Sequence, residues 1–293
     1  MLILSRDSDL RLGRATLFDA LVEASRTHGP KKPILEDQER RPLSYLDLIR
    51  AAFALSRKIA GFTKPGEHVG VMLPSSAGTV VTFFALHAIG RVPTMLNFTP
   101  GLRNLKAACE LPQVKTVLTS HRFVEQAKLH DQVDALETLA SVVYLEDVRA
   151  SIGLPDKLYA ASAAALPNAF RKAARPDDPG VILFTSGSFG APRGVVLSQK
   201  NLVANVRQIA AHIALDPSWV MFNPLPTFHC FGLTGGVLLP LFTGMKAFEY
   251  PSPLHTKQIP PLVKESEASI LLATDTFVNQ NARSAEPDEV WWR

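Results

Sequence analysis

The side chains best suited to chemistry lie together in residues 184–194, which read FTSGSFGAPRG. Glycines let backbone N–H groups approach an anion, hydroxyls donate hydrogen bonds, and arginine supplies a permanent cation, so this composition suits a polyphosphate. The residues concerned are Thr185, Ser186, Gly187, Ser188, Gly190, Arg193 and Gly194. They predict a phosphate-binding loop, and the alternative is a Ser/Gly-rich surface turn that binds nothing.

Three familiar loops are excluded by spacing. A Walker loop needs G-x-x-x-x-G-K-[ST], a dinucleotide fingerprint needs G-x-G-x-x-G, and neither pattern occurs here. No serine of the loop has glycine both two residues before and two residues after it, so the G-x-S-x-G elbow of hydrolases is absent as well.

The elements that must position the loop are short and apolar. Residues 181–183 predict a buried strand before it, and residues 195–198 and 199–213 predict a strand and a helix after it. The same alternation of strand and helix runs along the chain, which indicates a layered α/β fold of mostly parallel sheets with flanking helices. Helices are expected at 17–27, 45–61, 75–90, 121–136 and 232–241, and strands at 69–73, 114–119, 142–145, 220–223 and 270–273.

The order of residues 185–194 resembles the phosphate-loop signature T-S-G-[ST]-[TE]-G-x-P-K-G of the adenylate-forming superfamily. Two departures stand out: Phe189 replaces a polar residue, and Arg193 replaces lysine. Residues 223–233, NPLPTFHCFGL, resemble the family's P-L-x-H-x-x-G-L region beside the acyl pocket. Residues 250–255 and 272–277 are similar to the branch that activates fatty acids for acyl carrier protein, which includes the synthetase half of the bifunctional 2-acylglycerophosphoethanolamine acyltransferase/acyl-acyl carrier protein synthetase.

The resemblance implies the N-terminal part of an adenylate-forming large domain, with subdomains at 1–175 and 176–293. It implies ATP-dependent activation of a fatty acid through an acyl-adenylate, with ATP and Mg²⁺ as cofactors and acyl carrier protein or coenzyme A as acceptor. Thr185, Arg193 and His229 would be the catalytic residues. The acid pocket would be formed by Phe228, His229, Phe231 and Gly232, although core packing is an equal alternative for the two phenylalanines, and a core histidine for His229.

The family's downstream Y-G-x-[ST]-E segment, ribose-binding aspartate and lysine-bearing C-terminal domain have no counterpart after the loop. We therefore expect a chain truncated at its C-terminus and incomplete as a catalyst. A second hypothesis is a non-catalytic nucleotide-binding or interaction remnant. A third is a ligase acting on aryl or amino acids.

Composition sets further bounds. The 31 basic and 27 acidic residues give a net charge of +4 without any basic run, so we expect no nucleic-acid partner. Cys109 and Cys230 are expected to be buried and reduced, and no metal site is expected. The longest uncharged stretch, 217–245, contains several prolines and glycines and predicts a buried or interfacial helix rather than a membrane span. The expected location is cytoplasmic, with peripheral membrane contact left open.

Overall fold

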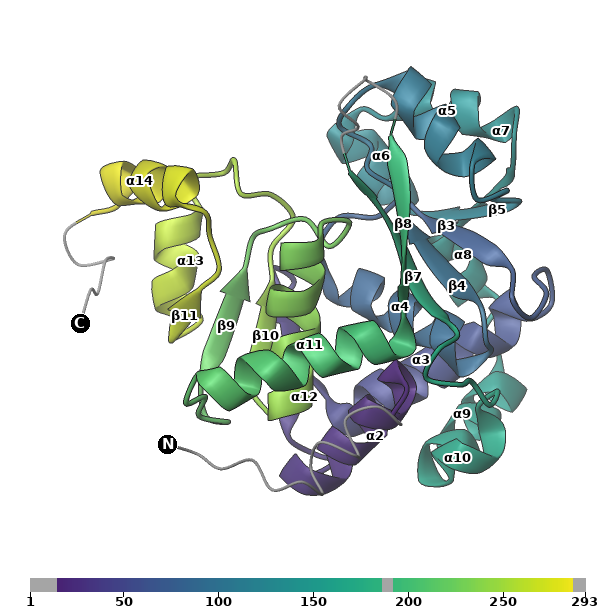
Figure 1. Ribbon diagram of the computed structural model, residues 1–293, viewed down its shortest axis with the longest axis horizontal. Helices are drawn as coiled ribbons and strands as arrows, with labels where there is room; N and C mark the ends of the chain where they lie inside the picture. Colours follow the sequence, from purple (N-terminus) through teal and green to yellow (C-terminus); the bar gives the residue numbers. More distant parts are fainter. Residues whose placement is uncertain (1–14, 186–191, 287–293) are drawn as a thin grey trace.

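The computed structural model describes residues 15–185 and 192–286, in which two β-sheets alternate with three layers of helices (Figure 1). All pairs of neighbouring strands are parallel except one at an edge of each sheet. This arrangement confirms the predicted α/β fold. Within these two ranges, no helix combines the length and the apolar character that crossing a bilayer requires.

The six-stranded sheet has the order β6-β5-β3-β4-β7-β8, and β8 runs antiparallel to β7. Its strands are β3 (His68–Val71), β4 (Val92–Met95), β5 (Thr116–Thr119), β6 (Ser141–Tyr144), β7 (Pro179–Thr185) and β8 (Arg193–Ser198).

The five-stranded sheet has the order β11-β9-β10-β1-β2, and β2 runs antiparallel to β1. Its strands are β1 (Pro33–Asp37), β2 (Leu43–Ser44), β9 (Val220–Asn223), β10 (Lys246–Glu249) and β11 (Ile270–Leu271). The early strand β1 thus pairs with the late strand β10, while β7 and β8 complete the sheet formed by the first half of the chain. Membership of the sheets does not follow the expected division at residue 175, and that division stays a prediction.

Helices packed between the sheets form the main core. They are α2 (Leu17–His28), α3 (Tyr45–Ile59), α4 (Ala77–Ala88), α11 (Gln199–His212) and α12 (Leu239–Thr243). The helix α4 carries Phe83 and Phe84, both almost completely buried, and its neighbour α3 contributes Phe53 to the same cluster. Serine or threonine caps the amino ends of α2, α3 and α11 in reciprocal capping boxes, which explains why these helices begin at the expected positions.

The outer faces of both sheets are also covered by helices (Figure 1). The six-stranded sheet packs against α5 (Leu102–Glu110), α6 (His121–Ala127) and α7 (His130–Glu137), and the five-stranded sheet against α13 (Ile259–Glu265), which contacts α14 (Asp275–Ser284). The remaining helices are α8 (Leu145–Ala150), α9 (Leu154–Ala165) and α10 (Pro167–Phe170). Asp156 of α9 forms ion pairs with Arg57 and Lys58 of α3.

Three expectations need correction. The single helix expected at 121–136 is two helices, because Lys128 adopts a left-handed conformation that ends α6. The helix expected at 232–241 begins as a π-helix, η1 (Gly232–Leu238), which continues into α12. Cys230 is exposed, whereas Cys109 is buried as expected and burial raises the pKa of its thiol to about 12.

Candidate functional site

The hairpin of β7 and β8 carries the predicted phosphate loop. Thr185, the last residue of β7, lies directly opposite Arg193, the first residue of β8, and Gly194 pairs with Phe184. Thr185, Arg193 and Gly194 are exposed. The antiparallel register therefore places a hydroxyl and a guanidinium opposite each other where the connecting loop of the hairpin begins and ends. Ser186, Gly187, Ser188, Phe189 and Gly190 lie outside the described residues.

The neighbouring strand β4 links the hairpin to the segment expected to bind the acid. Because Thr94 of β4 pairs in parallel with Ile182 of β7, the residues that follow β4 lie at the same edge of the sheet as Thr185. One of them, Phe98, packs edge-to-face on Phe228 with ring centroids 5.2 Å apart. Phe98 was not predicted as a site residue, because it belongs to no motif in the sequence.

The segment from Asn223 to Gly232, which follows β9 and which we call the 223–232 loop, is joined to the other sheet by Ser75. Ser75 follows β3, and its buried hydroxyl donates to the carbonyl of Leu225 at 2.9 Å and accepts from the Thr227 N–H at 3.1 Å. The carboxyl ends of strands from both sheets therefore meet here. The edge formed by these strand ends is the place where α/β folds bind ligands.

Two residues of the 223–232 loop differ sharply in burial. Phe228 is buried in the core between the sheets, and its place in an acid pocket stays a prediction. His229 is exposed, which excludes the alternative of a core histidine. Its backbone carbonyl accepts from Leu233 N–H and its N–H donates to the Pro226 carbonyl, so the main chain is fixed while the imidazole faces outward.

Phe231 and Gly232, also expected in the acid pocket, lie on opposite sides of the chain. Phe231 is 46% exposed and packs over Gly235. Gly232 is buried, and a Cβ there would lie 2.2 Å from the Pro226 carbonyl oxygen. Gly232 is therefore required for the close approach of two backbone segments. The structure thus brings Phe228, His229 and Gly232 into one turn and leaves Phe231 at its surface.

A buried polar pair fixes the shape of this turn. The side-chain amide of Asn223 donates to Glu249 at 2.8 Å and to the Gly232 carbonyl at 3.3 Å, and its oxygen accepts from the Leu225 N–H. Both Asn223 and Glu249 are completely buried, and Oε1 of Glu249 has no hydrogen-bond partner among the described residues. In the sequence, Glu249 stands alone between Phe248 and Tyr250. A single acidic residue in an apolar segment indicates a buried, hydrogen-bonded carboxyl, but Glu249 was not predicted as part of the site.

Burial raises the pKa of the Glu249 carboxyl well above its ordinary value, and the nearby Asp37 carboxylate raises it further, whereas the Asn223 hydrogen bond opposes the shift. Asp37 pairs with Glu249 across β1 and β10, and it accepts hydrogen bonds from the backbone N–H groups of Ala77 and Glu39. The raised pKa favours a protonated Glu249 carboxyl beside Asp37.

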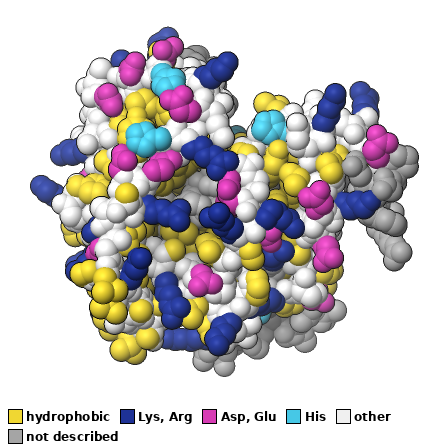
Figure 2. Space-filling model, turned by 180° about the vertical axis from the view of Figure 1, so that it is seen from behind, with side chains coloured by type: hydrophobic (Ala, Val, Ile, Leu, Met, Phe, Trp, Pro, Cys, Tyr) yellow, Lys and Arg dark blue, Asp and Glu magenta, His cyan; other side chains and the backbone are white. Residues whose placement is uncertain are grey.

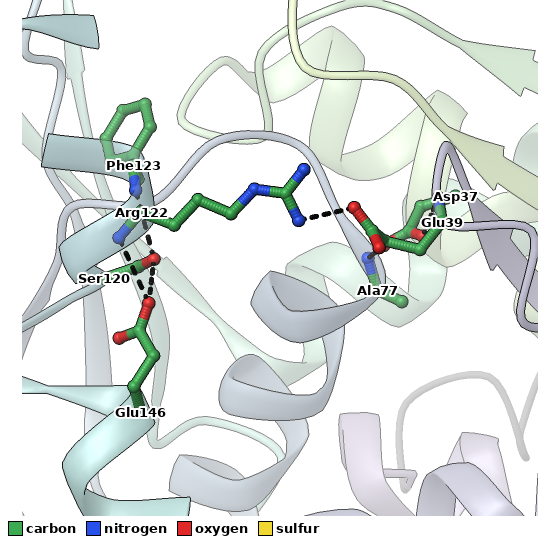
Figure 3. Close-up of polar contacts among 7 residues, drawn as sticks. All are labelled: Asp37, Glu39, Ala77, Ser120, Arg122, Phe123 and Glu146. Atoms are coloured by element: carbon green, nitrogen blue, oxygen red, sulfur yellow. Dashed lines mark hydrogen bonds and ion pairs between the residues drawn. The ribbon is translucent and has the colours of Figure 1, made fainter. Parts of the chain in front are cut away.

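Polar contacts also cross between the sheets at the surface (Figure 3). Arg122, near the start of α6, forms an ion pair with Glu39, which follows β1. The same end of α6 is held by Glu146, which accepts hydrogen bonds from Ser120 and from the Arg122 N–H. Both members of the Arg122–Glu39 pair are about half exposed, so this contact connects the sheets only weakly.

One groove in the described part of the molecule lies away from this site. It measures about 880 Å³ and runs along the amino ends of β3 and β5, where Lys64, His68 and Lys115 contribute to its walls. None of the predicted site residues lines it. Across residues 15–185 and 192–286, no three His, Cys, Asp or Glu side chains gather in an arrangement that could hold a metal ion.

A family model described as AMP-binding enzyme matches residues 22–291, which is most of the chain. The chain belongs to the AMP-binding enzyme family. The fold agrees with this assignment: the ATP-bound form of MatB from Rhodopseudomonas palustris superposes with a TM-score of 0.75 over 92% of this chain, at 23% identity, and 51% of MatB is covered.

Two curated relatives of this AMP-binding chain are also similar in sequence. The 4-coumarate–CoA ligase 2 of Oryza sativa subsp. japonica is 28% identical over 264 residues, covering 80% of this chain and 44% of the relative. The medium-chain-fatty-acid–[acyl-carrier-protein] ligase TtuA of Teredinibacter turnerae is 25% identical over 259 residues, covering 75% and 40%. The chain therefore spans less than half the length of these two relatives.

Proposed function

We propose that this chain supplies the phosphate-binding and acid-binding part of an enzyme that activates a carboxylic acid with ATP. The observation that carries the proposal is the β7–β8 register, which sets Thr185 opposite Arg193 on either side of the T-S-G-S-F-G-A-P-R-G segment. Membership of the AMP-binding family and the acid–CoA and acid–carrier-protein ligases among its relatives support the same reaction class.

In the proposed reaction, a carboxylate oxygen attacks the α-phosphorus of ATP. The new O–P bond gives an acyl-adenylate, and the bond to the bridging oxygen breaks so that pyrophosphate leaves with the electron pair. Donors placed in advance around the phosphates stabilise the charge that builds up there. The hydroxyls of Thr185, Ser186 and Ser188 and the backbone N–H groups of Gly187 and Gly190 would bind the β- and γ-phosphates, and Arg193 and Gly194 would close the cradle.

His229 would approach the carboxylate, since it is exposed on a turn whose backbone is fixed. Phe228 would support that turn from the core. The described residues offer no cluster for Mg²⁺, so we derive no step through the metal ion, although ATP commonly carries it on its phosphates.

We further propose that the acid is a fatty acid and that the acyl group passes to the thiol of acyl carrier protein or coenzyme A. Residues 250–255 and 272–277 resemble the branch that uses acyl carrier protein. A fatty-acid–carrier-protein ligase and a medium-chain fatty-acid–CoA ligase of Escherichia coli are both among the relatives. The second candidate is a nucleotide-binding protein without catalytic activity. The β7–β8 hairpin would bind the phosphates in that case as well.

The test of the loop is nucleotide binding by Arg193→Ala, measured by calorimetry with ATP and with AMP. Because Arg193 would contact the polyphosphate tail, ATP affinity should fall by about tenfold or more, as expected for loss of a charged hydrogen bond, while AMP affinity changes little. Arg193→Lys should retain most of the affinity, and Arg103→Ala, an exposed arginine on α5, is the control. Equal losses for ATP and AMP would place Arg193 elsewhere.

Fatty-acid-dependent exchange between ATP and pyrophosphate separates the two candidate functions. Exchange above background, lost in Arg193→Ala, supports acid activation by this chain. ATP binding without exchange supports the non-catalytic candidate. Exchange supported by aryl or amino acids instead of fatty acids would replace the proposed substrate class.

A further inference from the structure

Helices α9 and α10 carry an apolar surface that the rest of the chain leaves uncovered. Leu154 is 69% exposed, Leu158 61% and Leu166 64%. Leu154, Leu158, Ala161 and Ala165 share one face of α9 at helical spacing, and all are exposed. We call this face, with Leu166 and Phe170 that continue it, the α9–α10 surface. Side chains of this kind gather at the lower left of Figure 2, over α9 and α10.

The opposite face of α9 is firmly attached, so the leucines are held outward. Asp156 accepts from Lys58 at 2.7 Å and from Arg57 at 3.2 Å, and the Arg57 guanidinium lies 5.0 Å from the ring centre of Tyr159. Tyr159 in turn packs on Phe170 at 5.4 Å. The helix cannot bury its leucines by rotating without breaking these contacts.

Basic residues outnumber acidic ones in the segment that carries the α9–α10 surface, although the exposed Asp177 follows it just before β7. Residues 149–175 contain five basic residues and one acidic residue, and the acidic one, Asp156, is buried in its ion pairs with α3. Within the described ranges, no ion pair involves Arg149, Lys157 or Lys172, and each of these three is exposed. Lys and Arg side chains accordingly border the apolar cluster in Figure 2.

We propose that the α9–α10 surface docks on a membrane that contains anionic phospholipids. Exposed leucines on one helical face, flanked by lysine and arginine and without an exposed carboxylate within residues 149–175, are features that let a helix lie in the lipid interface. A protein partner is less well matched, because this surface offers mostly leucine and alanine, with Phe170 as its one aromatic residue, rather than the cluster of aromatic anchors typical of interface centres.

The proposed orientation leaves the candidate site accessible from water. The α9–α10 surface precedes the amino end of β7, whereas Thr185 ends that strand, about 20 Å further on. The helix α4 gives the same direction: its first residue, Ala77, is near the candidate site, and its last, Ala88, accepts a hydrogen bond from Lys172 N–H. Docking and nucleotide binding would therefore occur at opposite ends of the same elements, and this inference does not depend on the proposed reaction.

The experiment is co-sedimentation of the whole chain with vesicles of equimolar phosphatidylcholine and phosphatidylglycerol, compared with vesicles of phosphatidylcholine alone. Binding should be stronger to the anionic vesicles and should weaken as salt is added. The double variant Leu154→Glu/Leu158→Glu should bind at least about tenfold more weakly. Its control is Leu111→Glu/Leu254→Glu, which makes the same change at two leucines exposed elsewhere.

Charge reversal gives an independent measurement. Lys157→Glu/Lys172→Glu should weaken vesicle binding by about thirtyfold or more, since each basic residue near an anionic surface contributes about 1 kcal/mol. Arg103→Glu/Lys257→Glu makes the same charge change at two exposed residues, on α5 and in the segment before α13, and should bind like the parent chain. The proposal is overturned if the parent chain does not bind anionic vesicles, or if the variants of the α9–α10 surface and their controls lose binding equally. It is also overturned if the leucine variants instead dissociate a dimer in sizing chromatography.

Discussion

At the scale of single residues, the candidate site depends on a buried carboxyl that takes no part in the proposed chemistry. Glu249 receives a hydrogen bond from Asn223, and Asn223 holds both ends of the 223–232 loop through Leu225 and the Gly232 carbonyl. The exposed His229 is thus positioned by a polar network that is itself buried. Such networks stabilise one conformation only while every member keeps the right protonation state.

Glu249 should make the stability of the fold depend on pH. Because its pKa is raised in the folded state, its contribution is complete below the unfolded value near 4 and is lost as the pH rises through the folded pKa. We expect the free energy of unfolding in urea to fall from pH 5 to pH 8. Glu249→Gln, which cannot ionise, should flatten this dependence.

The exposed Glu137→Gln serves as the control and should leave the dependence unchanged. A profile that is the same in the parent chain and in Glu249→Gln would show that Glu249 is not protonated in the folded state.

At the scale of elements, the π-helix η1 explains why the 223–232 loop is followed by so many glycines. A Cβ at Gly236 would lie 2.1 Å from Cγ of Asn223, so the helix can pass this close to the Asn223–Glu249 pair only without a side chain. The wider backbone of a π-helix is commonly found at functional sites. The helix η1 and the Asn223–Glu249 pair therefore depend on each other.

Gly236→Ala should therefore destabilise the fold by about 1–3 kcal/mol, the usual cost of overpacking a filled core. Gly78→Ala is a matched control, because a Cβ there meets only Ser76 Oγ at 3.6 Å within the first turn of α4. We expect Gly78→Ala to be neutral or to stabilise by up to about 1 kcal/mol. Chemical denaturation of both variants measures the difference, and equal effects would contradict the tight packing at Gly236.

Sequence reasoning located elements well where local signals were strong. Ser44 before a periodic apolar segment marked the start of α3, and the apolar residues 220–223 marked β9. It missed β1, β4 and β10, since Pro33, Pro93 and the charged Lys246 and Glu249 obscure their strand character. These strands are stabilised by pairing with other segments of the chain, and the residues within each strand do not indicate that pairing.

The candidate site was predictable only in part for the same reason. The hydroxyl and glycine pattern of residues 185–194 is local, so it could be read directly. The exposure of His229 and the burial of Phe228 depend on Ser75 and Phe98, which lie more than a hundred residues earlier in the chain. Contacts between residues so far apart in the sequence follow from the packing of the two sheets. They cannot be predicted from the spacing of neighbouring residues.

At the scale of the whole molecule, the two sheets are joined at the candidate site by contacts of unequal strength. Ser75 makes two buried hydrogen bonds to the 223–232 loop, whereas Arg122 and Glu39 form a half-exposed ion pair. Ser75→Ala should cost about 1–3 kcal/mol, because it leaves a buried N–H and a buried carbonyl unpaired. The coupling between Arg122→Ala and Glu39→Ala in a double-mutant cycle should be below about 1 kcal/mol and should vanish in high salt.

Urea unfolding of these variants measures both values, with Ser151→Ala as the control for loss of one hydroxyl, because the exposed Ser151 donates to the Val148 carbonyl of its own helix, away from the interface. A coupling between Arg122 and Glu39 that exceeds the cost of Ser75→Ala would show that the ion pair joins the sheets more strongly than Ser75 does.

The pairing of β1 with β10 has a consequence for synthesis on the ribosome. Leu35 is paired with Ala247, so 212 residues must be added before the partner of β1 exists. At the usual rate of translation, about 5–20 residues per second, β1 waits roughly 10–40 s. The antiparallel β2 covers one edge of β1 almost at once, through the pairs Pro33–Ser44 and Leu35–Leu43. The other edge stays unpaired during that interval, and because unpaired strand edges promote association, we expect the nascent chain to depend on chaperones that shield them.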